Sequence, residues 1–185
     1  MSSFASNGRT LIESDFMGAA IVPAFAGTTE NSGTAALLVG KVNGVVTLVT
    51  GTASGNRSAL TSGLNQKAED GSLVFSAIVQ NLSAITTRAV FIGLTDTVEM
   101  PIELNGVTIT STATDAVGFV YDTDATTDVV YIQGVATDVD TALLTAQRQN
   151  RGGATFVPTA GTYNEYRIEV NVDGDAYFYI DGEYV

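Results

Sequence analysis

Residues 163–185 read YNEYRIEVNVDGDAYFYIDGEYV, and apolar and polar side chains alternate along most of this stretch. Successive side chains of an extended chain point to opposite faces, so the alternation predicts a half-buried antiparallel strand. Its buried face is expected to carry Tyr166, Ile168, Val170 and Val172. Asp173-Gly174 comes next and predicts a type I′ hairpin turn, because both central residues of that turn need positive φ.

The return strand follows the same pattern. Phe178 and Ile180 are expected to face inward together with Ala176, while Tyr177 and Tyr179 face outward. A second Asp-Gly pair, at residues 181–182, ends the strand. The C-terminal segment is therefore predicted to be a β-hairpin that needs a sheet to pack against.

The rest of the chain predicts further strands separated by turn signals about every 8–12 residues. Residues 89–95, AVFIGLT, are apolar almost throughout, which is typical of a central strand covered on both faces. Residues 27–33 are expected to form a polar loop, and Asn43-Gly44 is expected to turn a hairpin between residues 35–39 and 45–50. No stretch predicts a convincing amphipathic helix, so the fold class is all-β, a sandwich or jelly roll of two antiparallel sheets. We expect an arm or first strand at residues 1–18 and one sandwich domain over residues 19–185.

The composition limits the function classes. The 185 residues are 45% hydrophobic and only 15% charged, so the chain is expected to fold rather than stay disordered. No apolar run approaches the 18 or so residues of a membrane span. There is no cysteine and no histidine, which removes thiol chemistry, the commonest general base and most zinc sites. The Glu-x-Asp-x-Glu run of many sandwich-fold glucanases is also missing, so we expect a protein that is not an enzyme.

The net charge of −12 is unevenly distributed. Residues 1–95 hold five basic and five acidic side chains, whereas residues 96–185 hold three basic and fifteen acidic ones. An acidic surface repels phosphates, so we expect no nucleic acid partner. The acidic half either keeps the protein soluble or attracts a basic partner or cations.

Acidic residues gather in one loop, at Asp122, Asp124 and Asp128. Aspartates at this spacing can converge on calcium, which takes six to eight oxygen ligands. The loop lacks the glycine and glutamate of a helix-loop-helix calcium site, and Asp and Thr also form local side-chain turns. We favour local turns and keep calcium as the alternative; no other cofactor is expected.

Tyrosines gather at the C-terminal hairpin, where Tyr177, Tyr179 and Tyr184 are candidate interface or ligand aromatics. A tyrosine can bury its ring in a core or interface while its hydroxyl stays wet. Exposed aromatic rings also stack on sugars. We favour packing and keep sugar binding as the alternative.

The segment from Tyr166 through Asp173-Gly174 to Asp181-Gly182 resembles the penultimate hairpin of the concanavalin A-like lectin/glucanase superfamily, the laminin-G-type jelly roll. The resemblance implies that fold. Jelly rolls of this type usually continue with one or more strands after the hairpin. We therefore expect the open edge to be completed by a neighbouring subunit, by the N-terminal arm or by residues absent from this sequence.

A longer stretch, over about residues 88–182, resembles a family of tailed-bacteriophage structural proteins. The segments that carry this resemblance are 90–96, 99–101, 112–119, 122–128, 134–140 and 160–163. The resemblance implies a virion component, such as a capsid decoration protein or part of a fibre, and it carries over no catalytic residue.

Together these features predict a capsid decoration protein, made in the bacterial host cytoplasm and located on the capsid surface. The expected partners are the major capsid protein and copies of the chain itself, in a homo-oligomer for which a trimer is the first expectation. The alternative is a carbohydrate-binding, lectin-like module of the virion that attaches to host-surface glycans.

Overall fold

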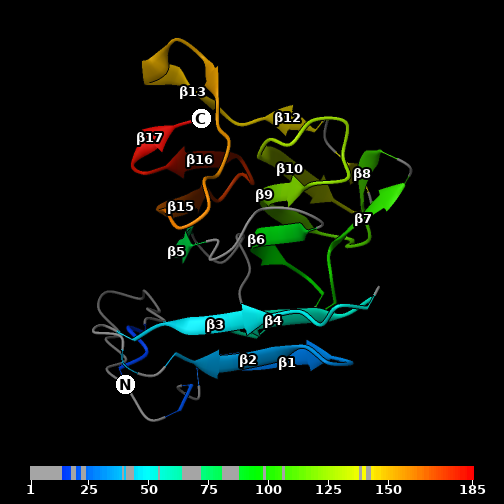
Figure 1. Ribbon diagram of the computed structural model, residues 1–185. Helices are drawn as coiled ribbons and strands as arrows, with labels where there is room; N and C mark the ends of the chain where they lie inside the picture. Colours follow the sequence, from blue (N-terminus) through cyan, green and yellow to red (C-terminus); the bar gives the residue numbers. More distant parts are fainter. Residues whose placement is uncertain are drawn as a thin grey trace. The chain divides into compact units, whose positions relative to one another are not determined.

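A computed structural model of the chain describes residues 14–17, 20–21, 24–38, 40, 44–53, 55–63, 72–80, 88–97, 99–105, 107–137, 139–140 and 143–185 (Figure 1). Contacts within the chain group the residues into an N-terminal unit, Met1–Leu64, and a C-terminal unit, Asn65–Val185. Each unit is described by itself. Most of the predicted arm at 1–18 lies outside the described residues, and the single domain over 19–185 stays a prediction.

The C-terminal unit contains two larger antiparallel sheets. The first, called the β15 sheet, has the order β17-β16-β15-β5. Its strands are β5 (Leu73–Gln80), β15 (Tyr163–Val170), β16 (Ala176–Ile180) and β17 (Glu183–Tyr184). The second, called the β9 sheet, has the order β11-β10-β9-β6, and β12 also pairs with β10. Its strands are β6 (Ala89–Thr95), β9 (Ala116–Asp122), β10 (Tyr131–Ala136), β11 (Val139–Asp140) and β12 (Leu144–Thr145).

Three short elements accompany these sheets. The hairpin of β7 (Ile102–Asn105) and β8 (Thr108–Ser111) is antiparallel, as is the pair of β13 (Gln147–Arg148) and β14 (Ala154–Thr155). A 3-10 turn, η2 (Gln149–Arg151), follows β13. No α-helix occurs among the residues that the structure describes, and none of their helices is long and apolar enough to cross a membrane. The all-β prediction is therefore confirmed.

Side chains from both sheets meet in one core. Phe119 of β9 packs edge-on against Tyr166 of β15 and Phe178 of β16, with ring centroids 5.2 and 5.3 Å apart. Ile168 and Ile180 belong to the same cluster and are fully buried. Two antiparallel sheets that share one apolar core form the layered arrangement of a β-sandwich.

Strand β9 is covered on both faces. Phe119 points into the shared core, while Val120 packs with Ile102 and Ile109 of the β7–β8 hairpin. The prediction of a central strand at residues 89–95 was therefore wrong in position. These residues form β6, which ends the β9 sheet and pairs with β9 among the described strands. The predicted coverage of both faces is confirmed, because Val90, Ile92 and Leu94 pack against the shared core and Phe91 packs against the second cluster.

The predicted alternation along residues 163–180 is confirmed, with one exception. Val172 is 58% exposed, because the strand ends at Val170 and a five-residue loop begins. Asp173-Gly174 does not form a type I′ turn, since Gly174 has positive φ and Asp173 does not. Asp181-Gly182 does adopt that geometry, with φ of 53° and 75° between the paired Ile180 and Glu183.

The N-terminal unit contains two antiparallel ribbons of two strands each. β1 (Ala26–Glu30) pairs with β4 (Arg57–Thr61), and β2 (Thr34–Leu37) pairs with β3 (Val46–Val49). The prediction of a polar loop at 27–33 was wrong in part, because residues 27–30 belong to a strand and only residues 31–33 form the turn. The β2–β3 pairing confirms the predicted hairpin, whereas Asn43 of its expected turn lies outside the described residues.

Candidate functional site

The outer surface of the β15 sheet exposes a set of apolar and aromatic side chains, which we call the tyrosine face. Strand alternation places them opposite the core residues Ile168, Phe178 and Ile180. The tyrosine face consists of Val74 and Ile78 on β5, Tyr163 on β15, Tyr177 and Tyr179 on β16, and Tyr184 on β17. Ile78 is 72% exposed, Val74 is 63% exposed, and Tyr177 and Tyr184 are 42% and 47% exposed. Large apolar side chains gathered in this way are typical of interaction surfaces.

The register of the sheet brings these side chains into rows. Tyr184 lies opposite Tyr179, and their rings meet edge-on with centroids 5.7 Å apart. Tyr177 lies opposite Glu169, which in turn lies opposite Val74. The three candidate tyrosines of the hairpin therefore lie on one surface, as the alternation predicts for Tyr177 and Tyr179.

Charged groups on this surface are engaged with one another. Arg167 forms an ion pair with Glu169, and its guanidinium lies 5.4 Å from the centre of the Tyr179 ring. The Ser76 hydroxyl donates to the carboxylate of Glu165 at 3.0 Å. The carboxylates and the guanidinium therefore have partners within the surface, and a docking partner meets aromatic and aliphatic groups on both sides of this paired row of charges.

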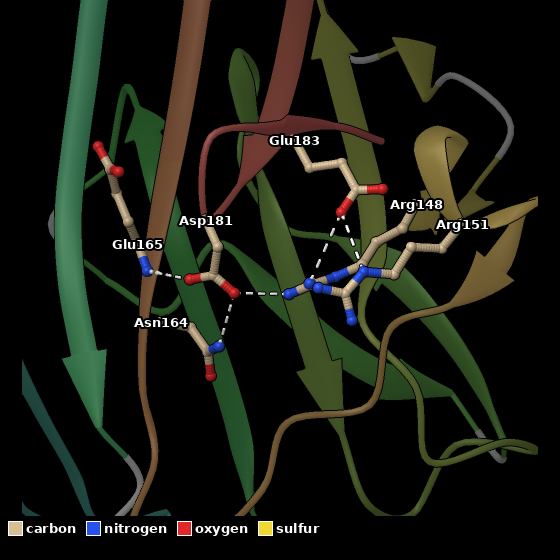
Figure 2. A network of polar contacts seen from close by, with 6 residues as sticks. All are labelled: Arg148, Arg151, Asn164, Glu165, Asp181 and Glu183. Atoms are coloured by element: carbon tan, nitrogen blue, oxygen red, sulfur yellow. Dashed lines mark hydrogen bonds and ion pairs between the residues drawn. The ribbon is translucent and has the colours of Figure 1, made fainter.

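A polar network fixes the end of this sheet, and Figure 2 shows its members. Asp181 is its centre, since the Asp181-Gly182 turn directs the carboxylate toward the start of β15. One carboxylate oxygen accepts the backbone N–H of Glu165 at 3.0 Å. The other accepts the Asn164 side-chain amide at 3.0 Å and Nη2 of Arg148 at 2.5 Å. Asp181 thus ties three segments of the chain together.

The same arginine continues the network to β17. Nη1 of Arg148 lies 3.7 Å from the carboxylate of Glu183, and Nε of Arg151 lies 3.4 Å from the same oxygen. The Arg148 guanidinium also lies 4.8 Å from the centre of the Phe156 ring. Its side chain is only 10% exposed, so these partners compensate for a nearly buried cation.

Two groups in this region have shifted pKa values. Burial raises the pKa of Asp181, but the hydrogen bonds from Glu165, Asn164 and Arg148 outweigh it and hold the pKa below its ordinary value. Burial, aided by the charge of Asp181, raises the pKa of Tyr166 to about 12 even though Arg148 acts in the opposite direction. Asp181 is therefore a stable anion and Tyr166 a neutral phenol at neutral pH.

No match to this chain is found among protein-family models, curated proteins or solved structures. The tyrosine face and the polar network are therefore the features from which a function can be inferred. The hollow between the two sheets, bordered by Val79, Phe119 and Tyr166, is about 10 Å³. That volume is close to the minimum for one water molecule, so this hollow is no ligand pocket.

Asp122 and Asp124 form a local turn, and the three candidate calcium ligands do not form a cluster. Asp122 is 6% exposed, and its carboxylate accepts the backbone N–H of Asp124 at 2.9 Å, which is a side-chain turn. The negative charge of Asp128 acts on Tyr121, whose pKa is raised by burial first and by that charge second. Among the described residues, no group of three or more acidic side chains is arranged to hold a metal ion.

Sequence reasoning missed Val74 and Ile78 of the tyrosine face and Arg148 of the network. The alternation in residues 73–80, LVFSAIVQ, was available as a signal, but every position except Ser76 and Gln80 is apolar and the faces cannot be told apart. Arg148 lies 33 residues before Asp181, and no local pattern connects them.

Proposed function

We propose that this protein is a structural component of a tailed-bacteriophage virion, a capsid decoration protein that packs its tyrosine face against the major capsid protein. The role contains no catalytic step and requires no cofactor. It places the protein on the capsid surface after synthesis in the host cytoplasm.

The observation that carries the proposal is the exposure of Tyr177 and Tyr184 on β16 and β17 and of Val74 and Ile78 on β5, all on one surface of the sheet, with the outward side chains of β15 between them. Tyrosine is enriched at the centres of protein interfaces, because its large rigid ring loses little conformational entropy when it is buried. Strand pairing fixes these side chains in position before a partner arrives. A preorganised surface of this kind gives affinity without a folding cost.

The sequence resemblance supports the choice of partner. The hairpin pattern similar to concanavalin A-like jelly rolls and the segments similar to phage structural proteins both lie in the C-terminal unit. We propose the jelly-roll topology for its two facing sheets on the same basis. Many copies bound to a symmetric shell would add avidity to a weak single contact.

Co-sedimentation of the purified protein with capsids stripped of it tests the proposal. We expect binding that saturates at a fixed copy number per capsid. Because the proposed contact is mainly apolar, raising the salt concentration should weaken binding little. An absence of binding at both low and high salt would overturn the decoration role.

A pair of matched variants tests the surface. Tyr177→Ser combined with Tyr184→Ser removes two exposed rings and should weaken capsid binding about tenfold or more. Leu144→Ser is the control, because Leu144 is 61% exposed on β12 of the other sheet. Equal loss in both proteins would contradict the tyrosine face as the contact.

Glycan binding is the second candidate, and the exposed rings of Tyr177 and Tyr184 are the observation that favours it. It predicts a saturable titration with cell-surface glycans that the double tyrosine variant loses. The titration is done with and without calcium, since the acidic loop at Asp122, Asp124 and Asp128 was the candidate calcium site.

A further inference from the structure

The described residues of the N-terminal unit form no buried core in the single chain. None of its described residues between 14 and 63 is buried, and all five residues of β1 are exposed. In the C-terminal unit, by contrast, Phe119, Ile168 and Ile180 are almost completely inaccessible. Burial of apolar surface is the main stabilising contribution to folding, so the described part of the N-terminal unit gains less from burial than the C-terminal unit does.

The sequence explains the low burial of these described strands. Small residues occupy the place where the two ribbons approach each other. A side chain at Gly27 would put its Cβ only 2.8 Å from the Cβ of Ala35, so the ribbons are close but bury little there. A two-stranded ribbon is marginally stable in water, and three or more strands with an apolar face are needed for independent stability.

The unit also exposes groups that another chain can complete. Leu48 and Val49 at the end of β3 are 45% and 49% exposed. Each ribbon has only two strands among the described residues, so each has two edges at which another strand can pair. Added strands would extend the ribbons and cover their apolar side chains.

The charge distribution indicates which partner fits. Residues 1–64 hold three basic and three acidic side chains, so the N-terminal unit has no net charge. Residues 65–185 hold five basic and seventeen acidic ones and carry the whole net charge of −12. Two C-terminal units repel each other, whereas two N-terminal units do not. A basic partner of another kind would be attracted to the C-terminal unit instead.

We propose that the N-terminal unit is the self-association module of this protein, in which the same units of further copies pack together and cover the apolar side chains that its described strands leave exposed. Homo-oligomers are the commonest assemblies of soluble proteins, and this unit is the part of the chain where copies meet without repulsion. The proposal concerns contacts between copies and does not depend on a virion role or on the tyrosine face.

Sedimentation velocity of the full-length protein over a range of concentrations tests the proposal. We expect an oligomer for the wild type. Val49→Glu puts a charge into the proposed contact and should weaken self-association at least tenfold. Ile78→Glu is the matched control, because Ile78, like Val49, is an exposed apolar residue of a strand but belongs to the tyrosine face. This variant should leave the oligomer intact.

The results separate this inference from the proposed capsid contact. Ile78→Glu should lower capsid binding without changing the oligomer. Val49→Glu should disperse the oligomer without changing the affinity of a single copy for the capsid. A wild type that stays monomeric throughout the concentration range would overturn the self-association module. Dispersal of the oligomer by Ile78→Glu but not by Val49→Glu would overturn it as well.

Hydrogen exchange on the wild-type protein gives a second test that needs no variant. Backbone amides of residues 26–61 should become more protected as the concentration rises, while those of β15 and β16 should stay constant. Protection of residues 26–61 that does not depend on concentration would contradict the proposal. Added salt should strengthen association, because it screens the repulsion between the acidic C-terminal units.

Discussion

The carboxylate of Asp181 and the guanidinium of Arg148 meet at 2.5 Å, although 33 residues separate them in the sequence. This contact joins the turn after β16 to the segment that leads into η2. The same carboxylate holds the start of β15 through the Glu165 N–H and the Asn164 side chain. One aspartate therefore fixes the end of the sheet whose outer surface is the tyrosine face.

Replacing Asp181 with Asn should lower the free energy of unfolding by about 1–2 kcal/mol, as measured by urea denaturation. Asn still tolerates the left-handed conformation that Asp181 adopts, so the change removes the charge without straining the turn. Hydrogen bonds to charged groups contribute about 1.5–3 kcal/mol, and the lower range is expected because the Asp181 side chain is 36% exposed.

Asp173→Asn is the control for this substitution. Asp173 also precedes a glycine in a loop of the same hairpin, but its side chain is exposed. Its contact with Asn171 is made by the backbone N–H, which the substitution retains. We expect a change within about 0.5 kcal/mol. An effect as large as that of Asp181→Asn would show that the network contributes nothing specific.

The stabilising effect of Asp181 should depend on pH. Its pKa is lowered in the folded protein, so the stability that it contributes is present above the ordinary carboxyl pKa of about 4 and is lost as the pH falls through the lower folded value. The difference in unfolding free energy between the wild type and Asp181→Asn should therefore be constant from pH 7 to 5 and shrink below pH 4. A difference that stays constant down to pH 2 would contradict the lowered pKa.

Tyr166 should make the protein sensitive to alkali. Its pKa is raised from 10.0 to about 12 in the fold, so its contribution is complete below pH 10 and is lost as the pH rises from 10 to about 12. Two pKa units correspond to about 2–3 kcal/mol. The wild type should lose this amount relative to Tyr166→Phe over that interval, measured by urea midpoints at each pH. Tyr163→Phe, on the exposed face of the same strand, should follow the wild type.

Local patterns in the sequence predicted the parts of the fold that depend on neighbouring residues. The period-two alternation from Tyr166 to Ile180 predicted the hairpin and the buried and exposed faces of its strands, because strand geometry alone decides which side chains share a face. The contact between Arg148 and Asp181 could not be predicted, since it depends on how distant strands are arranged. For the same reason the apolar run of β6 indicated a covered strand but not its place at the end of the sheet.

The two Asp-Gly pairs show how a side chain outside the motif changes a turn. Asp181-Gly182, which was expected only to end the strand, forms a turn of type I′. Before Asp173-Gly174, however, the Asn171 side chain accepts the backbone N–H groups of Asp173 and Asp175 at 3.0 and 2.8 Å. These bonds stabilise a longer loop in which Asp173 keeps negative φ. The dipeptide alone does not contain this information.

Removing a ring from the core should destabilise the C-terminal unit strongly. Phe119 is 1% exposed and contacts Tyr166 and Phe178 across the two sheets. Phe119→Ala should lower the unfolding free energy by about 3–5 kcal/mol, from lost burial and from the cavity that remains. Val157→Ala, at a position that is 53% exposed, should change it by less than about 0.5 kcal/mol. Similar urea midpoints for the two variants would contradict a core shared by both sheets.

Asn171 should matter more than its exposed position indicates. Asn171→Ala removes the acceptor of two backbone N–H groups and the side-chain contact with Asp175 at 3.0 Å, so we expect a loss of about 1–2 kcal/mol. Val172→Ala in the same loop is the control and should cost less than about 0.5 kcal/mol, since Val172 is mostly exposed. Hydrogen exchange of the Asp173 and Asp175 amides gives the direct measurement, because both should lose protection in Asn171→Ala while the amides of β15 keep theirs. Unchanged protection at Asp173 and Asp175 would mean that the Asn171 side chain does not hold the loop.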